Sequence, residues 1–315
     1  MAEDTRFLDW IIKEKAGLDK QEALQNGGTP ENWIPAAKIA RDREWNEMLD
    51  SMTPVSLWEE GAPNFDETYG QRQPSVIAYP EQNTGEPRGA VLISAGGGYI
   101  YKSVWEAEPM ARRFYEAGFQ TFIVNYRVQP YTRDDSAADA LRSVRFVRYY
   151  AERFNIKPDK IAVLGGSAGA RQSAIAATRF DFGNPDAADP VERVPSRPDA
   201  IIMNYGAMTE VGHLMQVGAF SFEKQNTLSE YSTDMNLRSD CPPFFVWQTV
   251  ADDPRLSCGL GMMLTHMGIP FEMHIFPEGP HGGGLYDGGH RFAPYYRSTT
   301  RWSQMAVEFL ENLGF

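Results

Sequence analysis

The stretch Leu164-Gly165-Gly166-Ser167-Ala168-Gly169-Ala170 decides how the rest of this chain is interpreted. An apolar run, residues 160–164, precedes it, and an alanine-rich run, residues 168–178, follows it. A strand, a tight glycine turn with a serine at its apex and then a helix form the setting in which the pattern G-x-S-x-G marks a nucleophile. The free N–H groups at the start of the helix would favour a negative charge developing beside the serine. The alternative is a glycine turn without catalytic meaning, and the rest of the chain decides between the two.

Composition limits the classes of protein to which the chain can belong. Its 315 residues, 42% hydrophobic and 23% charged, suit one large globular α/β domain, alone or with appendages. The net charge of −12, which no basic stripe offsets, argues against a nucleic-acid partner. Two cysteines are too few for a thiolate metal cluster, and no metal is expected. Without a signal-like or bilayer-length apolar run, the sequence predicts a soluble, cytoplasmic protein with no membrane association.

From about residue 74 onward, short apolar runs alternate with helical patterns. The predicted strands are Ser75–Tyr79, Ala90–Ser94, Thr121–Tyr126, Lys160–Leu164, Ala200–Asn204, Phe244–Val250 and Phe271–Phe276. Several are apolar almost throughout, as strands buried on both faces of a parallel sheet should be. The alternation predicts a mostly parallel, doubly wound sheet with helices on both faces. Ligands bind such sheets at the carboxyl ends of the strands, which is where Ser167 is expected.

Two segments do not follow the alternation. Residues 1–54 contain helical patches and are predicted to form an N-terminal helical extension of a main domain at 55–315. The extension is expected to pack on that domain, with a lid or a subunit contact as the alternative. Residues 205–243 lie between two strands and are too long for a plain connection, so a cap-like insertion is predicted there.

A catalytic serine needs a base, which has to come from the five histidines. These are His213, His266, His274, His281 and His290. His281 lies on a glycine-rich loop directly after the last predicted strand, so it is well placed to reach a serine at another strand's carboxyl end. A solvent-exposed loop residue is the alternative interpretation of His281. His290 is the reserve candidate, because it lies on the same loop but farther from the strand.

The orienting acid is expected after the strand at 244–250, where Asp252 and Asp253 are adjacent. Neighbouring side chains in extended backbone point in opposite directions, so only one of the two can face the histidine. Asp253 is favoured, with Asp252 solvating the loop or capping the following helix, but the choice between them stays open. The order Ser, Asp, His along the chain is the order found in α/β-hydrolases.

Oxyanion donors are expected from two places. The amide of Ala168 follows the serine directly, and the segment Gly96–Gly98 follows the second predicted strand. Three consecutive glycines allow the loop to point backbone N–H groups at the site. A phosphate-binding loop is a weaker interpretation, because Tyr101 stands where the third glycine of G-x-G-x-x-G would be.

With these residues in view, the chain resembles the α/β-hydrolase superfamily. It is most similar to the carbohydrate-esterase branch that includes acetyl xylan esterases and feruloyl-esterase-like proteins, a branch related to the hormone-sensitive-lipase group. The resemblance spans about Val55 to Phe315. Its matching segments are Gly96-Gly97-Gly98-Tyr99, Ser103, Glu106, Glu108-Pro109, Tyr126-Arg127-Val128, Asp253-Pro254 and Pro280-His281-Gly282.

The resemblance implies roles for individual residues. Ser167, Asp253 and His281 would be nucleophile, acid and base, and the amides of Gly97, Gly98 and Ala168 would form the oxyanion hole. No metal or organic cofactor is implied. In two places the chain departs from similar proteins: Ala95 stands where they have proline or histidine, and Ala170-Arg171 replaces their Gly-His.

The expected activity is that of a serine carboxylesterase acting on small acyl esters, mainly acetyl esters of carbohydrates. Tyr99 and Arg171 are expected to contact the substrate, a small ester such as an acetylated oligosaccharide. The alternatives are a peptidase or lactonase with the same catalytic residues, or a hydrolase-fold binding protein without catalysis. A homo-oligomer is left open.

Overall fold

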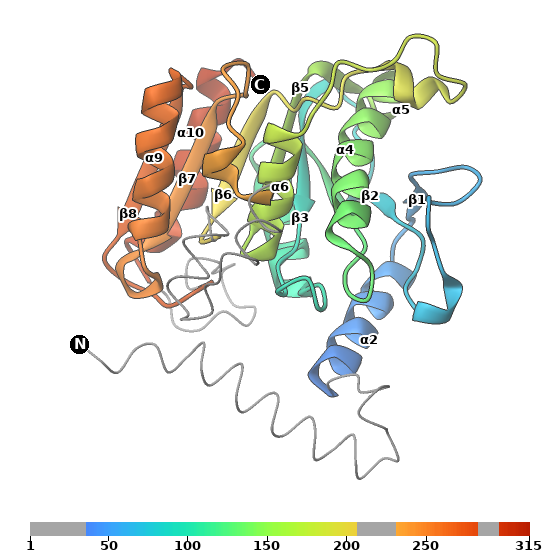
Figure 1. Cartoon of the computed structure of the whole chain (residues 1–315), viewed down its shortest axis with the longest axis horizontal. Coiled ribbons are helices and arrows are strands. Elements are labelled where there is room, and N and C mark those ends of the chain that lie inside the picture. The colour runs from blue at the N-terminus through green and yellow to red at the C-terminus, as the bar shows by residue number, and fades with distance from the viewer. Residues whose placement is uncertain (1–35, 207–230, 283–295) are drawn as a thin grey trace.

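A single sheet organises the molecule shown in Figure 1. The computed structural model describes residues 36–206, 231–282 and 296–315. Within these ranges eight strands lie in the order β1-β2-β4-β3-β5-β6-β7-β8. Their bounds are β1 (Val55–Ser56), β2 (Ser75–Tyr79), β3 (Arg88–Ser94), β4 (Gln120–Asn125), β5 (Ile156–Gly166), β6 (Ala200–Asn204), β7 (Phe244–Thr249) and β8 (Phe271–Phe276).

The sheet is doubly wound and mostly parallel, as predicted. β3 pairs in parallel with β4 on one side and β5 on the other, so the chain winds outward from this strand in both directions. β6, β7 and β8 extend the parallel part, whereas β1 and β2 pair antiparallel at the other edge. The strand predicted at 244–250 ends one residue earlier, because Val250 begins a short 3₁₀ helix, η6 (Val250–Asp252). The two-residue β1 was not predicted.

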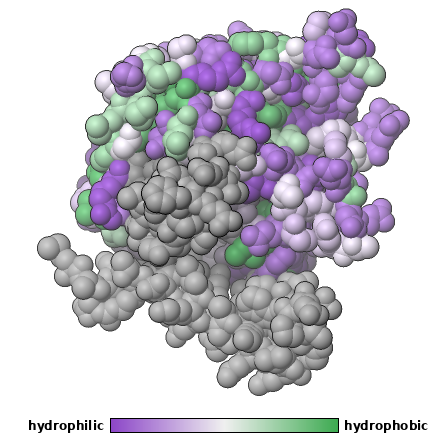
Figure 2. Space-filling view, in the orientation of Figure 1, coloured by the Kyte–Doolittle hydropathy of each residue, from purple (hydrophilic) through white to green (hydrophobic). Residues whose placement is uncertain are grey.

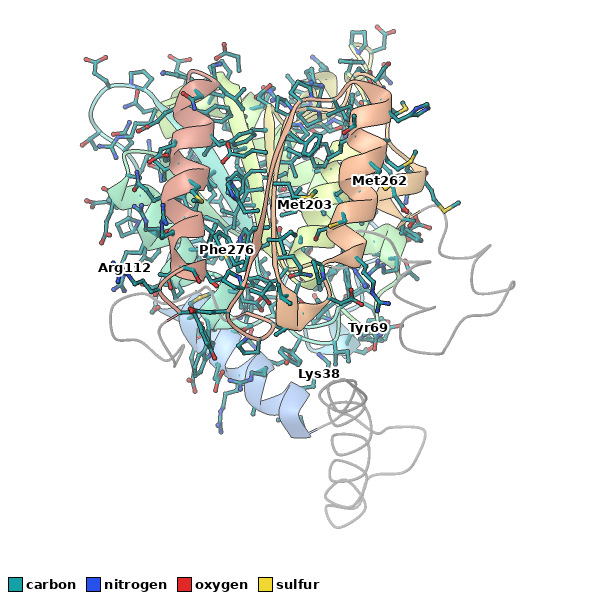
Figure 3. All side chains as sticks on the ribbon, turned by 90° about the vertical axis from the view of Figure 1, so that its left-hand side faces the viewer. Lys38, Tyr69, Arg112, Met203, Met262 and Phe276 are labelled. Atoms are coloured by element: carbon teal, nitrogen blue, oxygen red, sulfur yellow. The ribbon has the colours of Figure 1, made fainter. Side chains whose placement is uncertain are left out.

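Helices cover both faces of the sheet. Their bounds are α2 (Ala36–Asp50), α3 (Glu108–Glu116), α4 (Arg133–Tyr149), α5 (Ala151–Phe154), α6 (Ala168–Thr178), α9 (Arg255–Met267) and α10 (Trp302–Asn312). Side chains of α4, α5, α6 and α9 form one buried cluster with the sheet, and those of α2, α3 and α10 form another on the opposite face. Figure 3 shows the sheet between α9 and α10, with Met203 inside and Met262 pointing outward.

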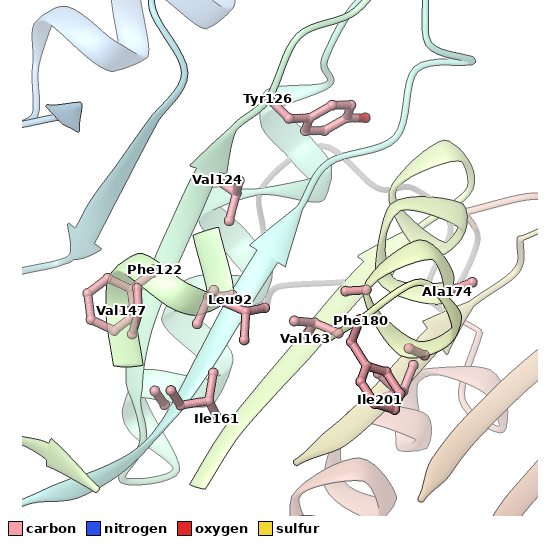
Figure 4. Close-up of a cluster of buried hydrophobic side chains, with 14 of the residues drawn as sticks. Leu92, Phe122, Val124, Tyr126, Val147, Ile161, Val163, Ala174, Phe180 and Ile201 are labelled. Carbon is pink, nitrogen blue, oxygen red and sulfur yellow. The ribbon is translucent and has the colours of Figure 1, made fainter. Parts of the chain in front are cut away.

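The first cluster holds α4 and α6 against the central strands (Figure 4). Leu92 of β3 and Val163 of β5 are buried in it, and the Phe122 ring meets the Phe154 ring edge to face at 5.0 Å. Each fully buried side chain of this size contributes about 1.5–3 kcal/mol. Packing on this scale holds the carboxyl ends of β3 and β5, and therefore Ser167, on a rigid support.

The second cluster depends on two buried tryptophans with satisfied N–H groups. Trp247 of β7 stacks on Trp302 at 5.4 Å and donates to Asn204 Oδ1 at 2.6 Å. Trp45 of α2 donates to Asn125 Oδ1 at 2.8 Å. Residues 36–50 of the expected extension therefore pack on the sheet. Residues 1–35, and residues 207–230 of the expected insertion, lie outside the described residues.

A buried ion pair fixes the segment that joins β4 to α4. The Arg127 guanidinium donates to both oxygens of Asp139, at 2.8–3.1 Å, and both side chains are essentially inaccessible to water. Burial raises the pKa of Asp139 to about 6 against the opposing effect of Arg127. Removing Arg127 would leave the Asp139 carboxylate buried without its ion-pair partner, so the pair holds the start of α4 in place.

Purple, hydrophilic residues dominate the coloured part of the face in Figure 2, in keeping with the 23% of charged residues. Among the described helices, none combines the length and the apolar composition that a membrane span requires.

Candidate active site

Ser167 lies at the junction of β5 and α6, at the carboxyl end of a central strand. Its backbone angles, φ 55° and ψ −119°, fall in a region that residues with a side chain rarely adopt and that costs about 1–3 kcal/mol. Its N–H donates to the Asn204 carbonyl on neighbouring β6 at 3.0 Å. The tight turn expected from the glycine pattern thus holds Ser167 in a strained conformation.

Neighbouring backbone leaves no room for a side chain at Gly165 or Gly169, on either side of Ser167. A Cβ on Gly165 would lie 2.1 Å from the carbonyl group of Gly169, and a Cβ on Gly169 would lie 1.9 Å from the Ser94 carbonyl oxygen. Both distances are far shorter than any real Cβ contact. The turn at residues 165–169, called the serine turn below, therefore packs directly on the end of β3.

Three side chains form a chain of hydrogen bonds above the serine turn. His281 Nε2 lies 2.8 Å from Ser167 Oγ, and His281 Nδ1 lies 2.7 Å from Asp252 Oδ2. The three residues follow β8, β5 and β7, so the strands' shared direction brings them to one edge of the sheet. An imidazole between a hydroxyl and a carboxylate is the arrangement that activates a serine for nucleophilic attack.

The carboxylate that contacts His281 is Asp252, and the expectation that Asp253 would face the histidine is wrong. Asp253 instead accepts from the Arg255 guanidinium at 2.7 and 2.9 Å. The alternation of side chains assumed extended backbone, but residues 250–252 form η6 and Asp253 has a φ of 52°. The helical turn directs Asp252 to the histidine and Asp253 away from it.

Opposing effects set the basicity of His281. Desolvation lowers its pKa, but the hydrogen bond and charge of Asp252 and the charge of Glu106 raise it, and the net shift is upward from 6.5. The charge of Arg171 acts in the downward direction. The Tyr205 ring packs edge to face on the imidazole, with ring centres 5.0 Å apart. The carboxylates of Asp252 and Glu106 therefore stabilise the protonated form of His281.

The expected oxyanion donors come from the loop after β3 and from the start of α6. Gly97 and Gly98 have φ of 132° and 65°, conformations that favour glycine, in a loop that follows β3. A Cβ on Gly97 would lie 2.1 Å from the Tyr101 carbonyl oxygen, so this position also needs glycine. Ala168 begins α6, where the first N–H groups of a helix have no acceptor within the helix. Residues 96–99, called the glycine loop below, lie against the serine turn, since a Cβ on Gly96 would lie 2.7 Å from the Gly166 carbonyl oxygen.

Glu106 and Tyr205 belong to the same site, although no catalytic role was predicted for either. The Tyr205 hydroxyl donates to Glu106 Oε1 at 3.0 Å, and the Gly96 backbone N–H also donates to this carboxylate. A Cβ on Gly166 would lie 2.4 Å from the Tyr205 hydroxyl and 2.7 Å from Glu106 Oε1. Burial raises the pKa of Glu106, and the His281 charge and these two hydrogen bonds act against that rise. The pair supports the glycine loop and the serine turn together.

The two residues expected to contact substrate, Tyr99 and Arg171, line one cavity. Its volume is about 330 Å³, and its other lining residues are Gly98, Gln129, Tyr131, Thr132, Arg133 and Ser136. Tyr99 is 4% exposed, and its hydroxyl donates to Gln172 Oε1 at 3.0 Å. The cavity thus adjoins the glycine loop on one side and α6 on the other.

The remaining histidines have other positions. His274 lies in β8 with Nε2 2.6 Å from Glu272 Oε1, and His266 lies in the last turn of α9. His213 and His290 lie outside the described residues. Within the described ranges, no cluster of three or more histidine, cysteine or acidic side chains is arranged to hold a metal ion.

The chain matches one protein family and is similar to curated proteins. The BD-FAE family matches residues 77–254. The chain is 30% identical over 79% of its length to endo-1,4-beta-xylanase B of Butyrivibrio fibrisolvens, and 26% identical over 67% to an acetylxylan esterase of Xylanibacter ruminicola. It covers only 39% and 43% of these two curated relatives, so it spans about two fifths of their length.

One solved structure aligns with most of this chain over almost its whole length. The acetyl ester-xyloside bifunctional hydrolase of Caldicellulosiruptor lactoaceticus is 30% identical, with a TM-score of 0.74 over 84% of this chain and 97% of the other. The similarity confirms the expected α/β-hydrolase fold and the resemblance to carbohydrate esterases.

The packing of the serine turn leads to a test with a matched control. We expect Gly169→Ala to lower the free energy of unfolding by about 1–3 kcal/mol or more, because the added methyl overlaps the Ser94 carbonyl. Gly259→Ala in α9, where a Cβ meets nothing within 4 Å, should instead raise it by about 0.5–1 kcal/mol. Denaturant unfolding of both variants measures the difference, and equal midpoints would contradict the steric account.

Proposed function

The chain belongs to the BD-FAE family, and from that premise we propose that it is a serine carboxylesterase for small acyl esters, mainly acetyl esters, of carbohydrates. The hydrogen-bonded chain from Ser167 through His281 to Asp252 is the observation that carries the proposal. The substrate class is supported by the relatives, which include an acetylxylan esterase and an acetyl ester-xyloside hydrolase.

The first half of the proposed reaction transfers the acyl group to Ser167. Its Oγ attacks the ester carbonyl carbon while His281 Nε2, 2.8 Å away, takes the hydroxyl proton. The amides of Gly97, Gly98 and Ala168 hold the oxyanion of the tetrahedral intermediate. The bond to the alcohol oxygen then breaks, and His281 gives its proton to that oxygen. The sugar hydroxyl leaves, and the acyl group stays on Ser167 as an ester.

The second half releases the acid. His281, again neutral, takes a proton from a water molecule whose oxygen attacks the acyl carbon. The tetrahedral intermediate is held by the same amides, and its collapse breaks the bond to Ser167 Oγ, which regains the proton from His281. The products are a carboxylic acid and free enzyme, so water is the only co-reactant consumed.

Two carboxylates support His281 in different ways. Asp252 holds Nδ1 at 2.7 Å, which fixes the ring and leaves Nε2 free of a proton to act as the base. Glu106 acts from a second side, where its charge stabilises the imidazolium and its hydrogen bond with the Gly96 amide supports the glycine loop. Glu106 is thus a positioning residue, because it acts through His281 and the loop.

Replacing the nucleophile tests the proposal directly. We expect Ser167→Ala to lower kcat on 4-nitrophenyl acetate and acetate release from acetylated xylan by about 10⁴-fold or more. Ser51→Ala, which removes an exposed hydroxyl after α2, is the matched control and should keep wild-type turnover. Wild-type turnover by Ser167→Ala would contradict the assignment.

The neighbouring aspartates provide a second comparison. Asp252→Asn should lower kcat by about 10³–10⁴-fold, because asparagine cannot stabilise the imidazolium and favours the wrong tautomer. Asp253→Asn should change kcat by less than about tenfold, because Asp253 pairs with Arg255 rather than with His281. Steady-state kinetics on one ester settles the comparison, and the reverse ranking would show that Asp253 is the acid.

Glu106 should influence the pH dependence of the reaction. Activity requires neutral His281, so kcat/KM should rise with pH through the pKa of that residue. Glu106→Gln keeps the hydrogen-bond acceptor but removes the charge that raises the pKa of His281. The rise should therefore move to lower pH, and kcat should fall by about tenfold as the imidazolium loses stabilisation.

Glu108→Gln is the control for this pH profile, because it removes the same charge two residues away, where the carboxylate pairs with Arg112. Its profile should coincide with that of the wild type. A Glu106→Gln profile that also coincides with the wild type would contradict the role given to Glu106.

A further inference from the structure

One residue holds both ends of the segment that contains the glycine loop. Tyr126 directly follows β4, just beyond Val124 in Figure 4. Its hydroxyl donates to the Ala95 carbonyl at 2.6 Å, immediately before the glycine loop. Its own backbone carbonyl accepts from Lys102 Nζ at 2.8 Å, shortly after that loop. Residues 95–102, called the clamped segment below, are therefore fastened at both ends to the carboxyl end of β4.

Backbone hydrogen bonds inside the clamped segment pass these two contacts on to the glycine loop. The Gly96 carbonyl accepts from the Ser103 N–H at 2.9 Å, and the Gly97 carbonyl accepts from the Ile100 N–H at 3.0 Å. Because Ser103 follows Lys102 directly, a shift of the lysine would also shift the Gly96 carbonyl. The directions of the backbone N–H groups in the loop therefore depend on how both ends of the segment are held.

Aromatic rings enclose the ammonium group of Lys102. The side chain is only 5% exposed, and its Nζ lies 5.4 Å from the centre of the Trp45 ring of α2 and 5.8 Å from that of Tyr126. Such contacts stabilise a cation that has left water. Burial raises the pKa of Tyr126 well above 10, so its phenol keeps the proton that it donates to Ala95.

The charged groups that act on Lys102 come from two helices. On α2, Asp42 and Lys38 pair with each other at 2.5 Å, and on α4 Asp139 pairs with Arg127. The two carboxylates raise the pKa of Lys102 and Lys38 lowers it, but burial is the largest effect and brings the pKa down to about 8. Lys102 is therefore mainly protonated at neutral pH and loses its proton under mildly alkaline conditions.

We propose that Tyr126 and protonated Lys102 form a clamp that sets the oxyanion donors of the glycine loop. Both are then positioning residues, because they act through the loop rather than on the substrate. A charged donor binds a carbonyl about twice as strongly as a neutral one, so loss of the lysine proton would loosen one end of the clamped segment. The inference rests on the proposed esterase function and adds two residues to its machinery.

The first test breaks only the contact with Ala95. Tyr126→Phe keeps the buried ring, and kcat on 4-nitrophenyl acetate should fall by about tenfold with KM within about twofold, because the donors act on charge that develops in the transition state. The inhibition constant of a trifluoromethyl ketone, which forms a tetrahedral oxyanion with a serine, should rise by about tenfold. Tyr149→Phe, which removes the hydroxyl of an exposed tyrosine of α4, is the matched control and should change none of these.

The second test follows the lysine through the pH dependence of kcat. The protonated form holds the loop, so wild-type kcat should rise through the pKa of His281 and fall again at about pH 8. Lys102→Met, which has a similar shape and no charge to bury, should lower kcat at neutral pH by about tenfold and abolish the alkaline fall. Lys157→Met is the control, because Lys157 lies at the opposite end of β5 from Ser167, and its profile should match the wild type.

Each failure has its own signature. Wild-type kcat in Tyr126→Phe, or a lower kcat with an unchanged inhibition constant for the ketone, would overturn the clamp and leave the esterase in place. An alkaline fall that persists in Lys102→Met would overturn the role of the lysine charge. Lower denaturant midpoints with unchanged kinetics would make both residues purely structural and also overturn the proposal. A wild-type protein inactive on 4-nitrophenyl acetate and on acetylated xylan would overturn the esterase and the clamp together.

Discussion

The backbone contact between the serine turn and the end of β3 is the constraint on which the site depends. Gly169 lies so close to the Ser94 carbonyl that a methyl group would stand 1.9 Å from its oxygen. Since the glycine loop continues directly from β3, this contact sets the distance between the nucleophile and the expected oxyanion donors. The two buried clusters pack on the two faces of the sheet and hold β3 and β5 in place. The core therefore keeps the site rigid.

Three charged side chains act on the pKa of His281. Asp252 and Glu106 act on His281 from two sides and stabilise its protonated form, while Arg171 acts against them. Arg171 also lines the cavity beside the glycine loop.

Much of this arrangement could be predicted from the sequence, for a physical reason. The strands at 200–204 and 271–276 were predicted to the residue, because alternating elements in a parallel sheet carry strong local patterns. The sequence favoured Asp253 over Asp252 as the partner of His281, which is wrong, because the 3₁₀ turn that orients Asp252 leaves little trace in the residues themselves. Glu106 was noticed only as part of a family pattern, because its partner Tyr205 lies 99 residues away and only the fold brings the two together.

Covalent labelling with a fluorophosphonate, followed by mass spectrometry of the intact protein and its peptides, tests the central claim most directly. The reagent reacts with a serine only where a neighbouring base activates the hydroxyl and hydrogen-bond donors stabilise the negative charge that develops on the reagent's oxygen. The account predicts one adduct per chain, on the peptide that contains Ser167, with much slower labelling of Asp252→Asn than of Asp253→Asn. An unlabelled protein, or an adduct on another residue, would contradict it.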